Sequence, residues 1–227
     1  MSLPTFASPG VPGGKRPLLV KPAVAAARLG VSRGSFDKLV ASGILPNPTP
    51  ADVVDALAAR PQLQVAEGEL TVLRTAARAE AYDADRDWIG FHVEHTDDEL
   101  DATSLRWWRS DADKVCDNRL YAVTVATIPV AVYEITGVLD TEQRTTEAGL
   151  RYHYSGRLLA RLGGPRPQSV ADYTVAGPSI EEDLAGMIRI GEGDELYERT
   201  RQIMASRIAV DSGGPIGYLE ATTATSK

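Results

Sequence analysis

The sequence predicts an α+β fold in which a small bundle of helices precedes a larger, strand-rich domain. Residues 21–60 show helical spacing with start and stop signals, and from residue 62 the pattern changes to short runs typical of strands. Pro61 lies at the change and interrupts the helical pattern. The 227 residues provide enough chain for two modest domains, each with its own core.

The first segment, residues 1–17, is rich in proline and glycine and has no periodicity. It predicts a flexible arm, followed by a helical domain at 18–61 and a strand-rich domain at 62–227. Lys15 and Arg16 end this arm. They are candidates for contact with a phosphate backbone, with a solvated tail as the alternative.

Two short helices joined by a tight turn are predicted for residues 21–43. The first runs from Ala23 to Leu29, Gly30 and Val31 turn the chain, and Ser32 caps a second helix from Arg33 to Ala41. Gly43 follows as a residue free to adopt positive φ. This arrangement is a helix-turn-helix.

The second helix has two contrasting faces. Phe36, Leu39 and Val40 are spaced for packing on the first helix. The opposite face carries polar side chains: Arg33, Ser35, Asp37 and Lys38. If this helix enters the major groove of DNA, its first turn places Arg33 and Ser35 nearest the base edges. Lys38 and Lys21 would then lie near phosphate.

At these residues the chain resembles the helix-turn-helix of the excisionase/MerR type. The matching residues are Ala25-Ala26-x-x-Leu29-Gly30-Val31-Ser32-Arg33, then Leu39-Val40-x-x-Gly43-Ile44-Leu45-Pro46, and a further helix start at Thr49-Pro50-Ala51-Asp52. The resemblance implies sequence-selective binding of double-stranded DNA in transcription control or site-specific recombination. In the further helix, we expect Thr49 to be the cap, Pro50 the first helical residue, and Asp52 to bond back to the cap amide. The short stretch 44–48 leaves little room for a long basic wing.

The charge distribution supports the same segment as a nucleic-acid binder. Residues 1–60 contain seven Lys/Arg against three Asp, whereas the remainder contains 17 basic and 28 acidic residues. A locally basic module can bind phosphate even within a chain of net charge −7. The acidic remainder would weaken indiscriminate binding, which favours a selective binder.

The strand-rich domain is predicted from alternating and β-branched runs. The strongest is a hairpin at Leu120–Ile135, with its turn at 126–129 and Pro129 confined to that turn or to an edge. The other expected strands are 69–74, 88–93, 150–154, 196–207 and 215–222, and the expected helices are 96–105 and 179–188.

Part of this domain is similar to the strand pattern of PUA-like barrels. The residues concerned are Trp107-Trp108-Arg109, the run 117–135 and Gly149-Leu150-Arg151-Tyr152-His153-Tyr154-Ser155-Gly156. The resemblance implies a barrel-like domain that binds nucleic acid, with Trp107, Trp108 or Tyr152 stacking on a base. Ordinary core packing is the alternative for these rings. Residues 193–199 and 213–216 look like parts of the UTRA effector domain of GntR-type regulators, which implies a small-molecule effector.

No pattern in the sequence predicts an enzyme. Dinucleotide, Walker and G-x-S-x-G motifs are missing, and on a strand His92 and His95 would face opposite sides, so we expect neither a cofactor nor a metal. The single Cys116 excludes an internal disulfide and fits a reducing cytoplasm. The sequence has neither an apolar run of about 18 residues nor a signal-peptide pattern, so we expect no membrane association.

The first functional hypothesis is therefore a cytoplasmic, homo-oligomeric DNA-binding protein. It would be a transcriptional regulator or a mobile-element or phage factor, with a C-terminal domain for dimerisation, sensing or accessory nucleic-acid contacts. The alternative is a phage or particle assembly protein that uses the helical module for protein contacts. A nuclease or modified-base reader built on the PUA-like portion is a third hypothesis.

Overall fold

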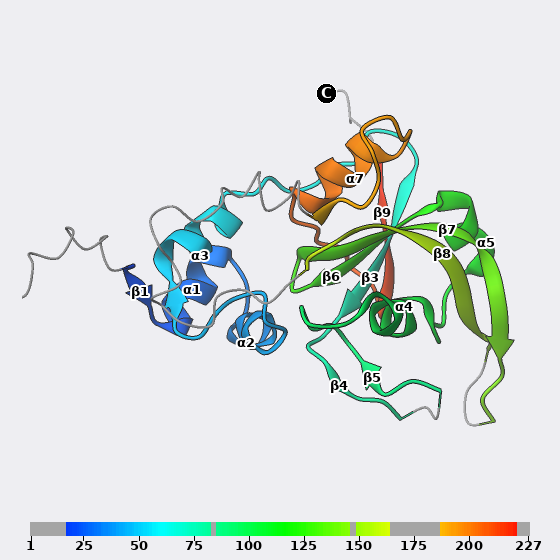
Figure 1. Cartoon of the computed structure of the whole chain (residues 1–227), viewed down its shortest axis with the longest axis horizontal. Coiled ribbons are helices and arrows are strands. Elements are labelled where there is room, and N and C mark those ends of the chain that lie inside the picture. Colours follow the sequence, from blue (N-terminus) through cyan, green and yellow to red (C-terminus); the bar gives the residue numbers. More distant parts are fainter. Residues whose placement is uncertain (1–16, 83–84, 146–148, 164–186, 222–227) are drawn as a thin grey trace, which may run out of the picture.

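The computed structural model describes residues 17–82, 85–145, 149–163 and 187–221. Within these ranges the chain is α+β, with six helices and a main sheet of five strands (Figure 1). The fold class is confirmed at this level. No helix in the described ranges is long and apolar enough to cross a membrane.

Three of the described helices lie before residue 60, as predicted, and three more lie among the later strands. The helices are α1 (Pro22–Leu29), α2 (Arg33–Ala41), α3 (Ala51–Ala58), α4 (Asp97–Leu105), α5 (Ala112–Asn118) and α7 (Tyr197–Met204). The strands are β1 (Leu19–Val20), β2 (Thr49–Pro50), β3 (Glu69–Thr75), β4 (Ala79–Glu80), β5 (Trp88–Ile89), β6 (Leu120–Val125), β7 (Ile128–Glu142), β8 (Arg151–Arg161) and β9 (Ile216–Glu220).

The first two helices form where local signals predict them. Gly30 ends α1 with φ of +63°, and the Ser32 hydroxyl accepts a hydrogen bond from the Ser35 amide at 3.0 Å, so Ser32 caps α2 as predicted. Phe36 and Leu39 are buried, and α2 packs against α1. Gly43 adopts φ of +74°, the conformation expected of it.

The predicted start of the third helix is wrong. Thr49 pairs with Val20 in a two-stranded antiparallel sheet, and its hydroxyl donates to the Pro46 carbonyl at 2.7 Å, so it caps nothing. Pro50 is extended and is itself the N-cap, and α3 begins at Ala51. The Asp52 carboxylate accepts from the neighbouring Val53 amide at 2.9 Å. Backbone pairing with a distant segment replaced the local capping pattern here.

The main sheet has the strand order β8-β7-β6-β3-β9, which makes β8 and β9 the edges in the described part of the chain. The pair β3 and β6 is parallel, and the other pairs are antiparallel. The two long strands β7 and β8 curve together (Figure 1), and register shifts interrupt their pairing. In β3, residues 70–73 are all buried, because this strand lies between β6 and β9 with both faces covered.

The predicted hairpin is present, but its turn is shorter than expected. Ala126 and Thr127 alone connect β6 to β7, and both have positive φ, as a two-residue type I′ turn requires. Pro129 lies inside β7, opposite Thr124, where the register with β6 shifts. The expectation that Pro129 stays in the turn or at an edge is therefore wrong, because the bulge accommodates a residue without an amide hydrogen.

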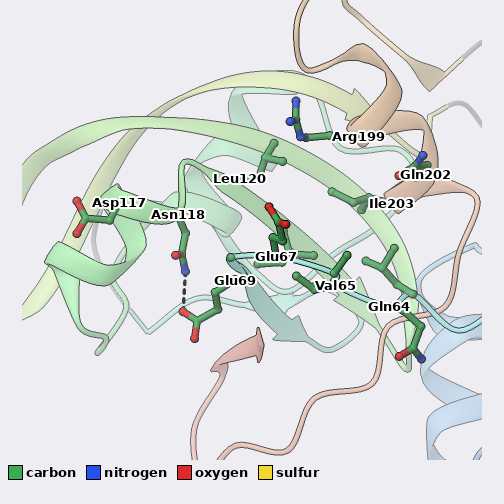
Figure 2. A pocket seen from close by; sticks show the side chains of 14 residues that line it. Gln64, Val65, Glu67, Glu69, Asp117, Asn118, Leu120, Arg199, Gln202 and Ile203 are labelled. Carbon is green, nitrogen blue, oxygen red and sulfur yellow. Dashed lines mark hydrogen bonds between the residues drawn. The ribbon is translucent and has the colours of Figure 1, made fainter. Parts of the chain in front are cut away.

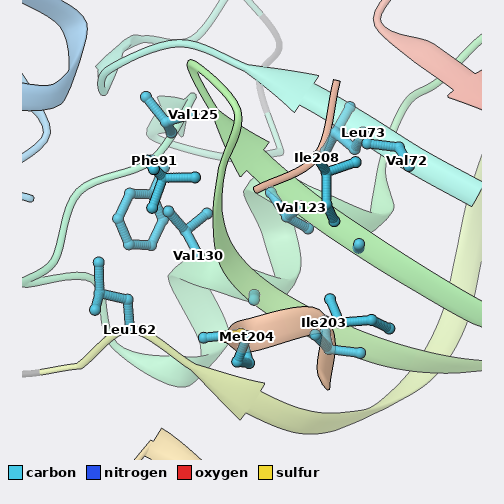
Figure 3. Close-up of a cluster of buried hydrophobic side chains, with 14 of the residues drawn as sticks. Val72, Leu73, Phe91, Val123, Val125, Val130, Leu162, Ile203, Met204 and Ile208 are labelled. Atoms are coloured by element: carbon cyan, nitrogen blue, oxygen red, sulfur yellow. The ribbon is translucent and has the colours of Figure 1, made fainter. Parts of the chain in front are cut away.

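Two further strand predictions are corrected. Residues 197–204 form helix α7, in which Thr200, Ile203 and Met204 are buried at helical spacing and pack in the main core (Figure 3). Only Trp88 and Ile89 of the run 88–93 are in a strand, because Gly90 turns the chain with φ of +81°. Strands β3, β8 and β9 and helix α4 with its capping box confirm their predictions. The helix expected at 179–188 falls almost entirely outside the described residues.

Side chains from the sheet and from α7 share one core. Figure 3 shows Val72, Val123 and Val130 of the sheet gathered with Ile203 and Met204. Burial of such aliphatic side chains removes apolar surface from water and is the main driving force for the packing of α7 on the sheet.

Hydrogen bonds tie the helical segment, residues 18–61, to the strand-rich part of the chain. Arg207 Nη2 donates to the Leu29 carbonyl at the end of α1 at 2.6 Å, and Arg60 Nη1 donates to the Met204 carbonyl at 3.1 Å. The Val93 amide donates to the Ser42 carbonyl at 3.0 Å. A β-carbon on Gly43 would lie 2.6 Å from Val93 Cγ2, so glycine permits this close approach.

Candidate nucleic-acid interface

The outward face of α2 presents the polar side chains that the sequence singled out. Arg33 and Lys38 are exposed, and Ser35 is partly buried. Packing of Phe36 and Leu39 beneath the helix fixes which face turns outward. The structure therefore brings these three candidate residues onto one short helix.

Arg33 is held by a neighbour on the same helix. Its Nε donates to Asp37 Oδ1 at 2.9 Å, and the two side chains are 57% and 55% exposed. The guanidinium also lies 6.0 Å from the centroid of the Phe36 ring. An exposed pair of this kind is worth only about 0.2–1 kcal/mol, so the guanidinium can exchange Asp37 for another acceptor at little cost.

In the first turn of α2, Gly34 has no side chain and lies between the two candidate residues Arg33 and Ser35. A β-carbon on Gly34 would meet only Ser32 Oγ, at 4.0 Å, so the helix backbone is accessible at this position. Ser32 Oγ donates to Ser35 Oγ at 3.0 Å, which leaves the Ser35 hydroxyl proton for another acceptor. Gly34 was not among the residues singled out from the sequence, because only the packing shows that no other described segment covers it.

The remaining basic candidates lie at or before the start of α1. Lys21 is exposed as the N-cap residue of α1. Lys15 and Arg16 fall outside the described residues. Residues 19–20 are held by their pairing with 49–50, a small sheet that the sequence did not predict. In the last turn of α1, the Arg28 guanidinium is paired with the Asp55 carboxylate of α3 at 3.0 Å.

The three aromatic candidates lie together but differ in access. Trp107 is buried, with 8% of its surface exposed, donates from Nε1 to Asp85 at 2.9 Å, and packs edge-on against His153. Trp108 and Tyr152 are partly buried and exchange two backbone hydrogen bonds. Because protein covers the Trp107 ring, stacking on a base is now proposed only for Trp108 and Tyr152.

The histidines considered as metal ligands lie in a turn and not on a strand. His92 Nδ1 lies 3.5 Å from Glu94 Oε2. His95 is buried, and this burial lowers its pKa to about 4. Cys116 is partly buried, and burial raises the pKa of its thiol. Among the described residues, no three His, Cys, Asp or Glu side chains are grouped to hold a metal ion.

Comparison of the chain with protein-family models, with curated proteins and with solved structures found no match.

Proposed function

We propose that the chain is a sequence-selective DNA-binding protein whose helical domain, residues 18–61, binds the major groove through α2. The observation that carries this proposal is the first turn of α2, where the exposed Arg33 and the partly buried Ser35 flank an exposed Gly34 that no other described segment covers. A helix capped and packed in this way presents side chains at fixed positions, which direct contact with base edges requires.

Charge supports the same location. The first 60 residues carry the excess of basic residues, whereas the rest of the chain is acidic. Neutralisation of phosphates by Lys21 and Lys38 would release counterions, so the affinity should fall as the salt concentration rises. The acidic domain repels DNA and favours contact through the helical domain.

The strand-rich domain would then support dimerisation, effector sensing or accessory contacts. One small helix-turn-helix contacts few base pairs, so two copies are needed for high specificity, and we propose a homo-oligomer in the cytoplasm. A PUA-like role for this domain stays a proposal that involves Trp108 and Tyr152.

Selection from a random double-stranded DNA library with the full chain tests the proposed function. We expect enrichment of one site, with an affinity for it that decreases with salt and exceeds that for scrambled DNA by about a thousandfold or more. Recovery of unrelated sequences after repeated rounds, with equal affinity for all of them, would contradict the proposal.

Asp37→Asn should strengthen binding to the selected site by about two- to fivefold. The change removes a carboxylate that holds the Arg33 guanidinium at 2.9 Å and that would repel phosphate. Fluorescence anisotropy with labelled DNA measures the effect. The matched control is Glu198→Gln in α7, which removes a similar exposed ion pair with Arg201 and should leave the affinity unchanged. Weaker binding by Asp37→Asn would argue against α2 as the DNA-contacting helix.

A protein-contact role is the second candidate, favoured by exposed apolar side chains at the start of the helical domain. Leu18 is 71% exposed, Leu19 44% and Val24 45%. Apolar side chains so close in the chain are suited to contact with another protein. Light scattering of the purified chain separates the candidates, because a monomer or dimer agrees with a regulator and a ring or large array with an assembly protein.

A further inference from the structure

A cavity of about 500 Å³ lies where the linker between the domains meets the strand-rich domain (Figure 2). Three separate segments line it: residues 63–70 of the linker and β3, residues 117–120 at the end of α5 and the start of β6, and α7 residues 199–203. Its size is that of typical small-molecule sites, which span about 300–1,000 Å³.

Acidic side chains dominate the charge of the cavity. Glu67, Glu69 and Asp117 line it together with a single basic residue, Arg199. Figure 2 shows the Glu67 side chain near the centre, between Leu120 and Val65. No ion pair or hydrogen bond of Glu67 is found among the described residues, so its carboxylate is available to a ligand.

The neighbouring Glu69 already has partners within the protein, which fix the position of its side chain in the cavity wall. Its carboxylate accepts from Asn118 Nδ2 at 2.9 Å and lies 2.7 Å from Lys114 Nζ. Asn118 Nδ2 also lies 3.0 Å from Thr71 Oγ1, so both polar side chains have set positions. The amide oxygen of Asn118 is a further hydrogen-bond acceptor among the residues that line the cavity.

Apolar side chains complete the lining. Leu63, Val65, Leu120 and Ile203 contribute hydrocarbon surface from the linker, β6 and α7. A cavity with a free carboxylate and amide acceptors beside hydrocarbon suits a cation attached to an apolar body, since the charge gains a charge-assisted hydrogen bond and the body leaves water.

We propose that this cavity binds a small organic amine, with the ammonium group at the Glu67 carboxylate and the apolar part against Val65, Leu120 and Ile203. The linker runs from Arg60, which bonds to α7 at Met204, into the cavity wall, so an occupant contacts the segments that join the two domains. The site goes beyond the proposed DNA binding and does not depend on it.

The test uses the full chain without DNA and 2-phenylethylamine as the probe. Amide NMR shifts of residues 63–70 and 199–203 should change and saturate at millimolar amine. Two probes of similar shape, neutral 2-phenylethanol and anionic 3-phenylpropanoate, should bind about fivefold or more weakly, because they lack the cation. Absence of saturable shifts, or equal binding of the three probes, would overturn the proposal.

Glu67→Gln should weaken binding of the amine about fivefold or more and leave binding of the alcohol unchanged. Glu67 is exposed, so the substitution should not disturb folding. Glu80→Gln, at an exposed carboxylate of β4 that does not line the cavity, is the matched control and should bind the amine like the parent chain. Equal affinity of Glu67→Gln and Glu80→Gln for the amine would also overturn the proposal. DNA binding is measured separately, so either proposal can fail alone.

Discussion

Arg33→Ala is expected to weaken binding to the selected DNA site by about 1–3 kcal/mol, which is roughly a 5- to 150-fold rise in Kd. In the free protein the Arg33 side chain is 57% exposed, is paired with Asp37 on its own helix and lies at the edge of contact with the Phe36 ring. Its loss removes only these weak, exposed interactions, so the change should leave the free energy of unfolding within about 1 kcal/mol of the parent. The effect should appear in specific binding and be much smaller on scrambled DNA, because a base contact carries sequence information and a phosphate contact does not.

Arg201→Ala provides a matched control for this experiment. Arg201 lies on α7, is 52% exposed and is paired with Glu198 three residues earlier, so it resembles Arg33 in exposure and pairing. Anisotropy titrations of both variants should show a loss for Arg33→Ala alone. Arg33→Lys keeps the charge but loses the planar fork, and it should recover only part of the affinity. Unchanged specific binding by Arg33→Ala would remove α2 from the role of recognition helix.

The elements predicted best were those set by nearby residues. Ser32 accepts a hydrogen bond from the amide three residues later, and Gly30 ends α1. Both act within one helical turn, so their roles can be predicted from the local sequence. The faces of α2 follow from the same spacing, and for this reason Arg33 and Lys38 were correctly expected at the surface.

The predictions failed where distant contacts decide the structure. Thr49 looked like a helix cap, but pairing with Val20, far earlier in the chain, placed it in a strand. Residues 197–204 looked like a strand, yet they form a helix. Thr200, Ile203 and Met204, three and four residues apart, are its buried residues. The cavity at Glu67 could not be predicted at all, because its walls come from three segments that only folding brings together.

Arg161→Met is expected to lower the free energy of unfolding by about 1–3 kcal/mol, the cost typical of leaving a buried hydrogen-bond acceptor without its donor. The Arg161 side chain is only 5% exposed at the end of β8, and its Nη1 donates to Asp97 Oδ1 at 2.6 Å. Its Nη2 donates to the carbonyls of His95 at 2.6 Å and Val93 at 3.3 Å. Methionine fills much of the volume but leaves these buried carbonyls without a donor.

Urea unfolding of Arg161→Met measures this effect, and Arg189→Met is its control. Arg189 approaches the same Asp97 carboxylate at 3.5 Å but is 49% exposed, so its loss should cost less than about 1 kcal/mol. Equal effects of the two substitutions would show that the buried carbonyls find other donors.

The consequence extends to the helical domain, because Arg161 holds the Val93 carbonyl while the Val93 amide bonds to Ser42, just after α2. Arg161→Met should therefore loosen the attachment of α2 to the strand-rich domain before the sheet itself unfolds, so protection of the Val93 amide from hydrogen exchange should fall before that of β6 and β7.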